Sequence, residues 1–141
     1  MNQNNEEKFL NIVYLTLTSK NITFLPDIIL RCFNLNTLDL TNNEISSLSI
    51  EIENLSKLKV LGLGFNKFKI LPNEISKLVN LICLDLSNNE IHSISQFCNL
   101  PNLKRLYLQY NKFTEISSNI KNFNNLIDLD LSNNEIHSIS Q

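Results

Sequence analysis

The chain has 141 residues, a length typical of one domain, and 43% of them are hydrophobic, which is enough to form a core. No apolar run approaches the roughly 20 residues that a transmembrane helix needs, so we expect no membrane-spanning segment. The net charge of −2 argues against general nucleic-acid binding, which needs a basic surface.

The first residues and the cysteines bear on where the protein works. Residues 1–8 are polar and acidic, unlike the apolar stretch of a secretory signal. Cys32, Cys83 and Cys98 are odd in number and far apart, so they form neither a disulfide framework nor a C-x-x-C metal site. We therefore expect an intracellular, cytoplasmic protein in a reducing environment.

The residues before Ile12 form half of a unit that is repeated later. Phe9 lies three places before Ile12, and an apolar residue or a cysteine lies three places before each later repeat. A short helix ending at Phe9, with Asn4 or Asn5 as its N-cap, would cover the open face of the first repeat. We divide the chain into an amino-terminal cap, residues 1–11, and a repeat domain, residues 12–141, whose last repeat is incomplete.

One pattern of leucines recurs along the rest of the chain. From Leu81 to Ile91, leucines fall at the first, fourth and sixth places, an asparagine at the ninth and an isoleucine at the eleventh. This pattern is L-x-x-L-x-L-x-x-N-x-L, and successive copies begin 23, 23, 23, 22 and 23 residues apart. Repeats one to six begin at Ile12, Leu35, Leu58, Leu81, Leu103 and Leu126.

Each repeat is expected to form a short strand, a turn and a looser return segment. The leucine spacing alone would also suit one face of a helix. However, Leu84–Leu86 and Leu129–Leu131 alternate with the period of a strand, and the paired asparagines that follow favour a turn. In two return segments, Pro26 and Pro72 suit the first turn of a short helix or 3₁₀ helix. Stacked units would form a parallel sheet over one continuous core.

With these leucines and asparagine turns, residues 12–141 resemble the leucine-rich-repeat family. The resemblance implies an α/β fold, a right-handed, curved solenoid with short parallel strands on the concave face. Short helical, 3₁₀ or irregular segments would form the convex face. The resemblance also implies that the ninth-position asparagines bond backbone groups inside each turn and form a buried ladder, which Lys20 interrupts in repeat one. The ladder consists of Asn43, Asn66, Asn89, Asn111 and Asn134.

The repeats resemble two intracellular subtypes of that family. Residues 71–78 resemble the 23-residue repeats of Ras-pathway scaffolds. Repeat four, one residue shorter, is more similar to the 22-residue repeats of a protein-phosphatase regulatory subunit. The chain therefore combines both types of repeat.

A longer period is superimposed on the repeats. Asn80–Gln96 and Asn125–Gln141 match at 16 of 17 positions and differ only where Cys83 corresponds to Asp128. The duplicated unit is therefore a pair of repeats. The tenth positions alternate in charge, so strands about 4.8 Å apart would bring acid and base together along one edge. This alternation either helps to fix the stacking or is a by-product of the duplication. The residues are Glu44, Lys67, Glu90, Lys112 and Glu135.

The third, fifth and eighth positions are expected to line the concave face. The even repeats place aspartate and asparagine there, including Asp39, Asp85 and Asp130. Repeats three and five contribute aromatic and basic residues, which are typical anchors of protein interfaces. The alternative is that these side chains merely cover a solvated sheet. We expect a partner site centred on Phe65, Lys104, Arg105, Tyr107 and Tyr110.

The sequence offers no recognisable catalytic or metal site. It contains no glycine-rich phosphate loop, nucleophile elbow or zinc motif. His92 and His137 occupy equivalent places two repeats apart, roughly 10 Å by strand spacing, which is too far to share one metal ion. Asp85 and Asp130 are similarly separated on an open sheet. We therefore expect no enzyme activity, no metal and no cofactor.

These observations favour a non-enzymatic interaction module or scaffold that binds a protein partner on its concave face. Two alternatives stay open. In the first, the chain is the targeting half of a larger enzyme; in the second, it is an accessory subunit of a large assembly. Nucleic acid and membrane are not expected as partners.

The carboxyl end raises a separate question. Repeat six stops at Gln141, sixteen residues into its unit. Its apolar side chains are therefore expected to keep an open side, and its strand to be an unpaired edge. A missing segment, another protein or self-association would cover this end, or the open end is tolerated. The side chains concerned are Leu126, Leu129, Leu131, Ile136 and Ile139.

Overall fold

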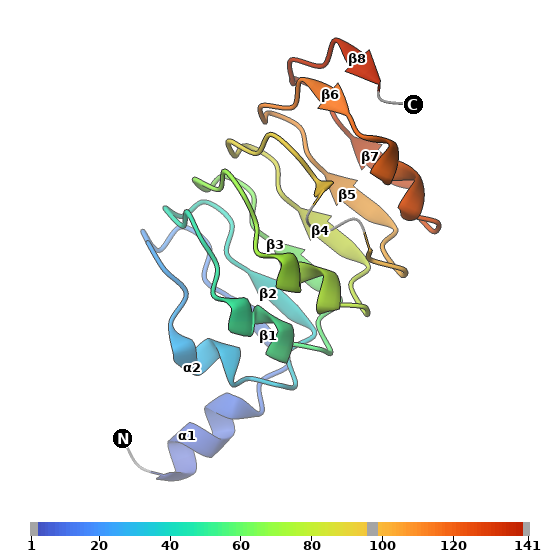
Figure 1. Cartoon of the computed structure of the whole chain (residues 1–141). Helices are drawn as coiled ribbons and strands as arrows, with labels where there is room; N and C mark the ends of the chain where they lie inside the picture. Colours follow the sequence, from blue (N-terminus) through green and yellow to red (C-terminus); the bar gives the residue numbers. More distant parts are fainter. Residues whose placement is uncertain (1–2, 96–98, 140–141) are drawn as a thin grey trace.

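A computed structural model of the chain describes residues 3–95 and 99–139, so Cys98 lies outside the described residues. The chain winds through successive coils, and its two ends lie at opposite ends of the stack (Figure 1). Within the described ranges, no helix combines the length and the apolar character that crossing a membrane requires. The helices and strands, with η for a 3₁₀ helix, are α1 Gln3–Leu10, β1 Tyr14–Thr16, α2 Asp27–Leu30, β2 Thr37–Asp39, η1 Ile50–Asn54, β3 Val60–Gly62, η2 Asn73–Lys77, β4 Cys83–Asp85, β5 Arg105–Tyr107, β6 Glu115–Ile116, η4 Ser118–Asn122, β7 Asp128–Asp130 and β8 Ser138–Ile139.

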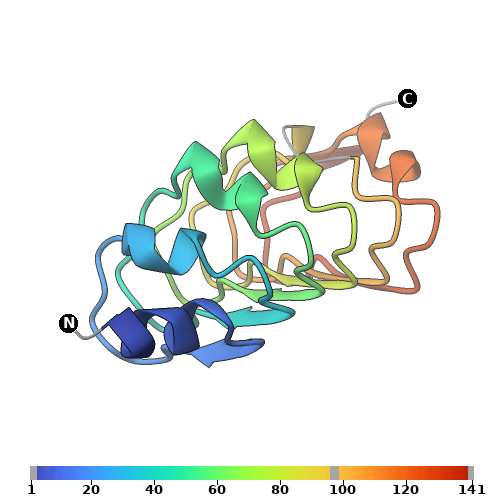
Figure 2. The ribbon, with the colours of Figure 1, turned by 90° about the horizontal axis from the view of Figure 1, so that it is seen from below.

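Six strands form one parallel sheet in chain order, β1-β2-β3-β4-β5-β7. Neighbouring strands pair at equivalent positions of the repeat, so that Leu38 lies beside Leu61 and Leu61 beside Leu84. The strand positions predicted from the alternation of leucine with polar residues are confirmed. Because each strand has only three residues, the sheet is a narrow band along one side of the molecule (Figure 2).

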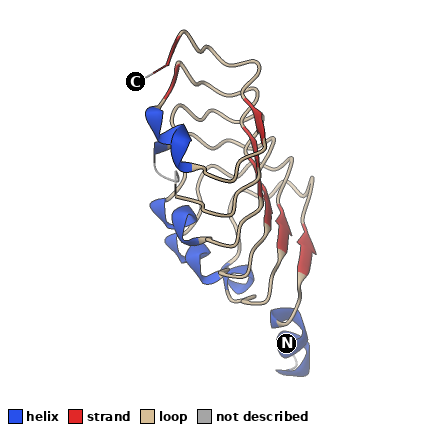
Figure 3. Cartoon of the chain, turned by 90° about the vertical axis from the view of Figure 1, so that its right-hand side faces the viewer, coloured by secondary structure: helices blue, strands red, loops and turns tan. Residues whose placement is uncertain are grey.

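The short helices α2, η1, η2 and η4 lie on the side of the stack opposite the sheet (Figure 3). Strands pack about 4.8 Å apart whereas a helix is about 10 Å wide, so the stack curves with the sheet on its concave side. The sequence predicted Pro26 and Pro72 in the first helical turn. They lie one residue earlier, at the N-caps of α2 and η2. Proline suits this place because the helix needs no backbone N–H there.

The fourth-position leucines point into the stack and form the centre of the core. Side chains of the first, sixth and eleventh positions surround them in one continuous cluster. Each fully buried leucine contributes about 1.5–3 kcal/mol to stability. Among the described residues, repeats one and six have another repeat on one side only, and Leu15 is partly buried while Leu129 is 37% exposed. The completely buried fourth-position leucines are Leu38, Leu61, Leu84 and Leu106.

Helix α1 covers the amino-terminal face of repeat one. It begins at Gln3, so Asn4 and Asn5 lie inside it and neither is its N-cap, contrary to the prediction. The helix ends at Leu10, and the side chains of Phe9 and Leu10 pack half-buried against the core. Helix α1 thus shields one end of the core from water.

Two return segments pair with each other on the helical side, which the sequence analysis did not predict. β6 and β8 form a second, two-stranded parallel sheet. In this sheet Glu115 lies beside Ser138 and Ile116 beside Ile139. The β-branched isoleucines are compatible with the extended backbone that this pairing requires.

The ninth-position asparagines join the turns of neighbouring repeats. Asn89 Nδ2 donates to Leu63 O at 2.9 Å and to Leu86 O at 3.1 Å. Its Oδ1 accepts from Phe68 N at 2.9 Å. One side chain therefore satisfies backbone groups in two successive repeats. Equivalent bonds are made by Asn43, Asn66, Asn111 and Asn134.

The two ends of this ladder differ from its middle. Asn134 is only partly buried, not buried as the resemblance implies, because repeat six has a neighbour on one side only in the described residues. At the other end the side chain of Lys20 is exposed, yet its backbone N–H donates to Asn43 Oδ1 at 3.0 Å. Repeat one is therefore bonded to the ladder through its backbone.

The residue before each ninth position has a left-handed backbone conformation. Its φ lies between 52° and 57° in all six repeats. Asparagine tolerates this conformation, whereas it costs most other residues roughly 1–2 kcal/mol. Repeats two, four and six have asparagine there, but repeats three and five have Phe65 and Tyr110. These two aromatic residues are therefore under local backbone strain.

The charged tenth positions pair only partly as predicted. Glu90 bonds to Lys69, not to the tenth-position Lys67, because Lys67 already pairs with Glu44. All these side chains are largely exposed, so each pair contributes less than about 1 kcal/mol. The pairs are Lys67–Glu44 at 2.8 Å, Lys69–Glu90 at 3.7 Å and Lys112–Glu135 at 3.8 Å.

Candidate binding surface on the concave face

The concave face consists of side chains that alternate with the buried leucines. Leu84 in β4 and Leu106 in β5 are buried, while the residues on either side of them are more exposed. Side chains two residues apart on a strand point to the same face. The third and fifth positions of all six repeats therefore form two parallel rows on the outer face of the sheet.

In β5, Arg105 and Tyr107 reach toward opposite neighbours. Arg105 lies close to the side chain of Cys83 in β4, which raises the pKa of the guanidinium above its ordinary value. Tyr107 Oη donates to Asp128 Oδ2 in β7 at 2.9 Å. This hydrogen bond raises the pKa of Tyr107. Tyr107 is thus held by the adjacent repeat six.

The three predicted aspartates share one local geometry. Asp39 Oδ1 accepts from Thr41 N at 3.0 Å, and Asp85 Oδ1 accepts from Ser87 N at 2.9 Å. Asp130 makes the same bond to the backbone of Ser132 at 2.9 Å, and this bond lowers the pKa of Asp130. The backbone two residues further on therefore orients each carboxylate where the strand ends.

The main hollow of this face lies over Gly62 and has a volume of about 330 Å³. It is open to solvent, and its walls come from β1 to β5. The glycine leaves the floor without a side chain, so the flanking strands form raised sides. Among the residues around it are Tyr14, Thr37, Asp39, Cys83, Asp85 and Tyr107.

Phe65 lies beside a second open hollow, of about 320 Å³, at the turns of the first three repeats. Its neighbours there are small or polar: Thr18, Ser19, Thr41 and Asn42. Phe65 is 54% exposed. This hollow therefore presents one apolar surface within a polar rim.

The structure distributes the eight predicted residues over a wider area than one cluster. Asp39, Asp85 and Tyr107 meet at the main hollow, and Phe65 lies at the second. The other four, Lys104, Arg105, Tyr110 and Asp130, line neither hollow.

Some residues at the main hollow were not among the predicted site residues. Tyr14, Thr37 and Gly62 occupy the third and fifth positions of repeats one to three. The glycine was the available signal, because a fifth position without a side chain must leave a gap between two aspartates.

Comparison with known families agrees with this architecture. Models of the leucine rich repeat match residues 34–55 and 56–113, and a model of two such copies matches residues 101–141. The chain belongs to the leucine-rich-repeat family. Among curated proteins, none matches the chain.

Solved leucine-rich-repeat structures from bacteria and plants resemble the chain. A leucine-rich-repeat protein of Leptospira interrogans is 30% identical with a TM-score of 0.65, and the match covers 90% of this chain and 42% of that one. The ectodomain of the receptor kinase SOBIR1 from Arabidopsis thaliana is 30% identical with a TM-score of 0.73, covering 89% and 73%.

A third similar structure contains a bound ligand. The plant peptide hormone receptor RGFR1, in complex with RGF2, is 31% identical to the chain with a TM-score of 0.70. The match covers 84% of this chain and 19% of the receptor. The chain thus spans less than half the length of this receptor and of the Leptospira protein.

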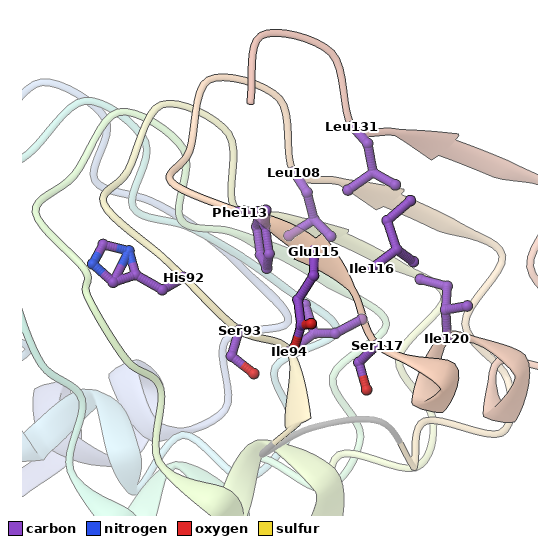
Figure 4. Close-up of a pocket in the computed structure, with 10 residues that line it drawn as sticks. All are labelled: His92, Ser93, Ile94, Leu108, Phe113, Glu115, Ile116, Ser117, Ile120 and Leu131. Carbon is purple, nitrogen blue, oxygen red and sulfur yellow. The ribbon is translucent and has the colours of Figure 1, made fainter. Parts of the chain in front are cut away.

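The leucine-rich-repeat domain also has a small cavity on its helical side, between repeats four and six (Figure 4). Ile94, Phe113 and Ile116 are among its apolar walls, and His92 is directed away from them. The cavity volume is about 40 Å³, which holds about one water molecule. In the described part of the chain, no group of three or more His, Cys, Asp or Glu could hold a metal ion. The concave face is therefore the better candidate site.

Proposed function

We propose that the chain is a non-enzymatic protein-interaction module that binds a protein partner on its concave face. Leucine-rich-repeat domains typically present an extended concave surface for binding. A similar structure, the plant receptor RGFR1, is solved in complex with a peptide hormone partner, which supports the proposal. The binding surface we propose combines the predicted aromatic and basic residues with the aspartates.

The observation that carries the proposal is the strain at Phe65 and Tyr110. Both residues are 54% exposed, so burial does not require an aromatic residue at either place. Both have a φ above 50°, where the even repeats have asparagine. A strained conformation that packing does not explain is a sign of function. Exposed aromatic side chains are also typical anchors of protein interfaces.

The experiment compares partner capture by the wild-type chain and by the double variant Phe65→Asn/Tyr110→Asn. Asparagine is the residue that neighbouring repeats use at the same backbone position, so the fold is retained. Immobilised protein is incubated with a lysate of the source cells, and captured proteins are quantified by mass spectrometry. Ile50→Asn is the matched control, because Ile50 is 64% exposed on the helical side, in η1.

We expect the double variant to lose on the order of tenfold or more of the protein that the wild type captures, since two interface anchors are removed. The Ile50→Asn control should capture the same protein at the wild-type level. If the double variant captures as much as the wild type while Ile50→Asn loses binding, the site lies on the helical side and the proposal is wrong.

A further inference from the structure

The chain has only two glycines, and both belong to repeat three. Gly62 and Gly64 occupy its fifth and seventh positions, so both lie on the concave side, where β3 ends. Neither has a positive φ, so the backbone conformation does not require glycine at either place. Because glycine has no side chain, both positions leave space on the concave side of repeat three.

Oxygen atoms from both flanking repeats fill the edge of that space. A Cβ on Gly62 would lie 2.8 Å from Asp39 Oδ1 and 3.1 Å from Thr41 Oγ1, both in repeat two. A Cβ on Gly64 would lie 2.9 Å from the Oγ of Ser87 and 3.0 Å from Asp85 Oδ2, both in repeat four. Two carboxylates and two hydroxyls therefore converge on repeat three from opposite sides.

No cation of the described residues neutralises these two carboxylates. The ion pairs join Glu44, Glu90 and Glu135 to lysines, and none of them includes Asp39 or Asp85. Each carboxylate accepts one backbone N–H and keeps further lone pairs for other donors. The hollow is thus rich in acceptors and carries negative charge.

We propose that the hollow over Gly62 receives an arginine side chain of the protein partner, held between Asp39 and Asp85. This inference rests on the proposed function, since it names what the partner inserts into the same concave face. The charge is complementary, because a guanidinium is a cation with five N–H donors and no acceptor. Tyr107, at one side of the hollow, offers an aromatic surface on which a guanidinium stacks.

The spread of the acceptors selects arginine over lysine. The strands that carry Asp39 and Asp85 are separated by β3, so they lie about 10 Å apart. An ammonium group is a compact point charge, whereas the planar fork of a guanidinium reaches acceptors on more than one side. The hollow is open to solvent, and its volume of about 330 Å³ leaves room for such a planar group.

The test uses the amides of Gly62 and Gly64, which are the only glycine signals in a ¹H–¹⁵N spectrum. The full chain is titrated with N-acetyl-arginine amide, with its neutral analogue N-acetyl-citrulline amide and with N-acetyl-lysine amide. We expect the arginine probe to shift both glycine signals saturably, and the citrulline and lysine probes to shift them much less. Equal shifts with citrulline or with lysine would overturn the assignment.

The matched variant is Asp39→Asn/Asp85→Asn, whose amide oxygens still accept the backbone bonds of Thr41 and Ser87. It should bind the arginine probe at least about tenfold more weakly, because both charges are removed. A ¹H–¹⁵N spectrum of the variant that resembles the wild-type spectrum confirms that the variant is folded. Arginine-induced shifts that persist in this variant contradict the proposal.

Partner capture then separates the two proposals. If Phe65→Asn/Tyr110→Asn loses the partner and Asp39→Asn/Asp85→Asn captures it at the wild-type level, concave-face binding stands and the arginine assignment fails. If neither variant affects capture, concave-face binding itself fails. A loss of capture in both variants, together with arginine-specific shifts of Gly62 and Gly64, supports both.

Discussion

Tyr107 Oη donates a 2.9 Å hydrogen bond to Asp128 Oδ2 across the boundary between repeats five and six. Asp128 is the single position at which the two 17-residue copies differ, and the other copy has Cys83 there. The one change between the copies thus provides the acceptor that holds Tyr107. A tethered ring loses less conformational entropy on binding than a free one, which favours its use in recognition.

The bond to Asp128 predicts an effect on tyrosine titration. It raises the pKa of Tyr107, because the protonated hydroxyl is the donor and the nearby carboxylate disfavours phenolate. Its contribution to stability is therefore present below the ordinary tyrosine pKa and is lost as pH rises through the raised one. Asp128→Asn should lower the pKa of Tyr107, measured by NMR of the ring carbons. Asp130→Asn, which leaves the bond in place, should not.

Core and surface positions of β4 should differ sharply in stability. Leu84→Ala should lower the free energy of unfolding by about 2–5 kcal/mol, because it leaves a cavity between stacked repeats. Asp85→Ala should cost at most about 1 kcal/mol, since it removes one hydrogen bond at the surface. Leu129→Ala is the control: it has nearly the same sequence context but is 37% exposed, so it should cost less than Leu84→Ala. Urea denaturation measures all three, and the reverse order of Leu84 and Asp85 would contradict the strand register.

Asn89→Ala should be more destabilising than a typical surface change. It leaves the buried Phe68 N without its acceptor and removes one of the two asparagine bonds to Leu63 O, so we expect a loss of more than about 2 kcal/mol. Asn134→Ala removes the same kind of bonds, but its site is only partly buried and water can replace them. Denaturation curves should therefore separate the two variants, and equal losses would show that burial does not set the strength of the ladder.

Relief of backbone strain gives a further prediction. Phe65→Asn should raise the free energy of unfolding by about 0.5–1 kcal/mol, because asparagine tolerates the left-handed conformation that the ring does not favour. Phe65→Ala is the control, since it removes the ring but does not relieve the strain, and should not stabilise the chain. Thermal or urea unfolding measures the change. A fall in stability with asparagine would mean that the ring packs more than its exposure indicates.

The ion pair between Lys67 and Glu44 can be examined by pH titration. The hydrogen bond from Lys67 lowers the pKa of Glu44. Its stabilisation is present above the ordinary glutamate pKa and is lost as pH falls through the lowered value. Lys67→Met should raise the Glu44 pKa toward its ordinary value in carboxyl-detected NMR, whereas Lys112→Met should leave it unchanged. Because both side chains are exposed, overall stability should change little.

The sequence by itself determined the repeat architecture, because burial in a stack of identical units is periodic. Leu38, Leu61 and Leu84 recur at one spacing, and a strand that must bury one face has only one register in which all of them point inward. The ninth-position asparagines follow from the same periodicity, since each closes an equivalent turn.

Only the tertiary structure decided which exposed side chains of different repeats lie close together. Asp39 and Asp85 converge on the two glycines of repeat three because their strands, β2 and β4, flank β3 on either side, although the two aspartates are 46 residues apart in the sequence. Glu90 pairs with Lys69, not with the expected Lys67, because an exposed lysine has several possible partners. The hydrophobic effect buries the same positions in every repeat, whereas contacts between exposed side chains depend on strand spacing and rotamers. Which oxygen atoms face the hollow is therefore visible only in the folded chain.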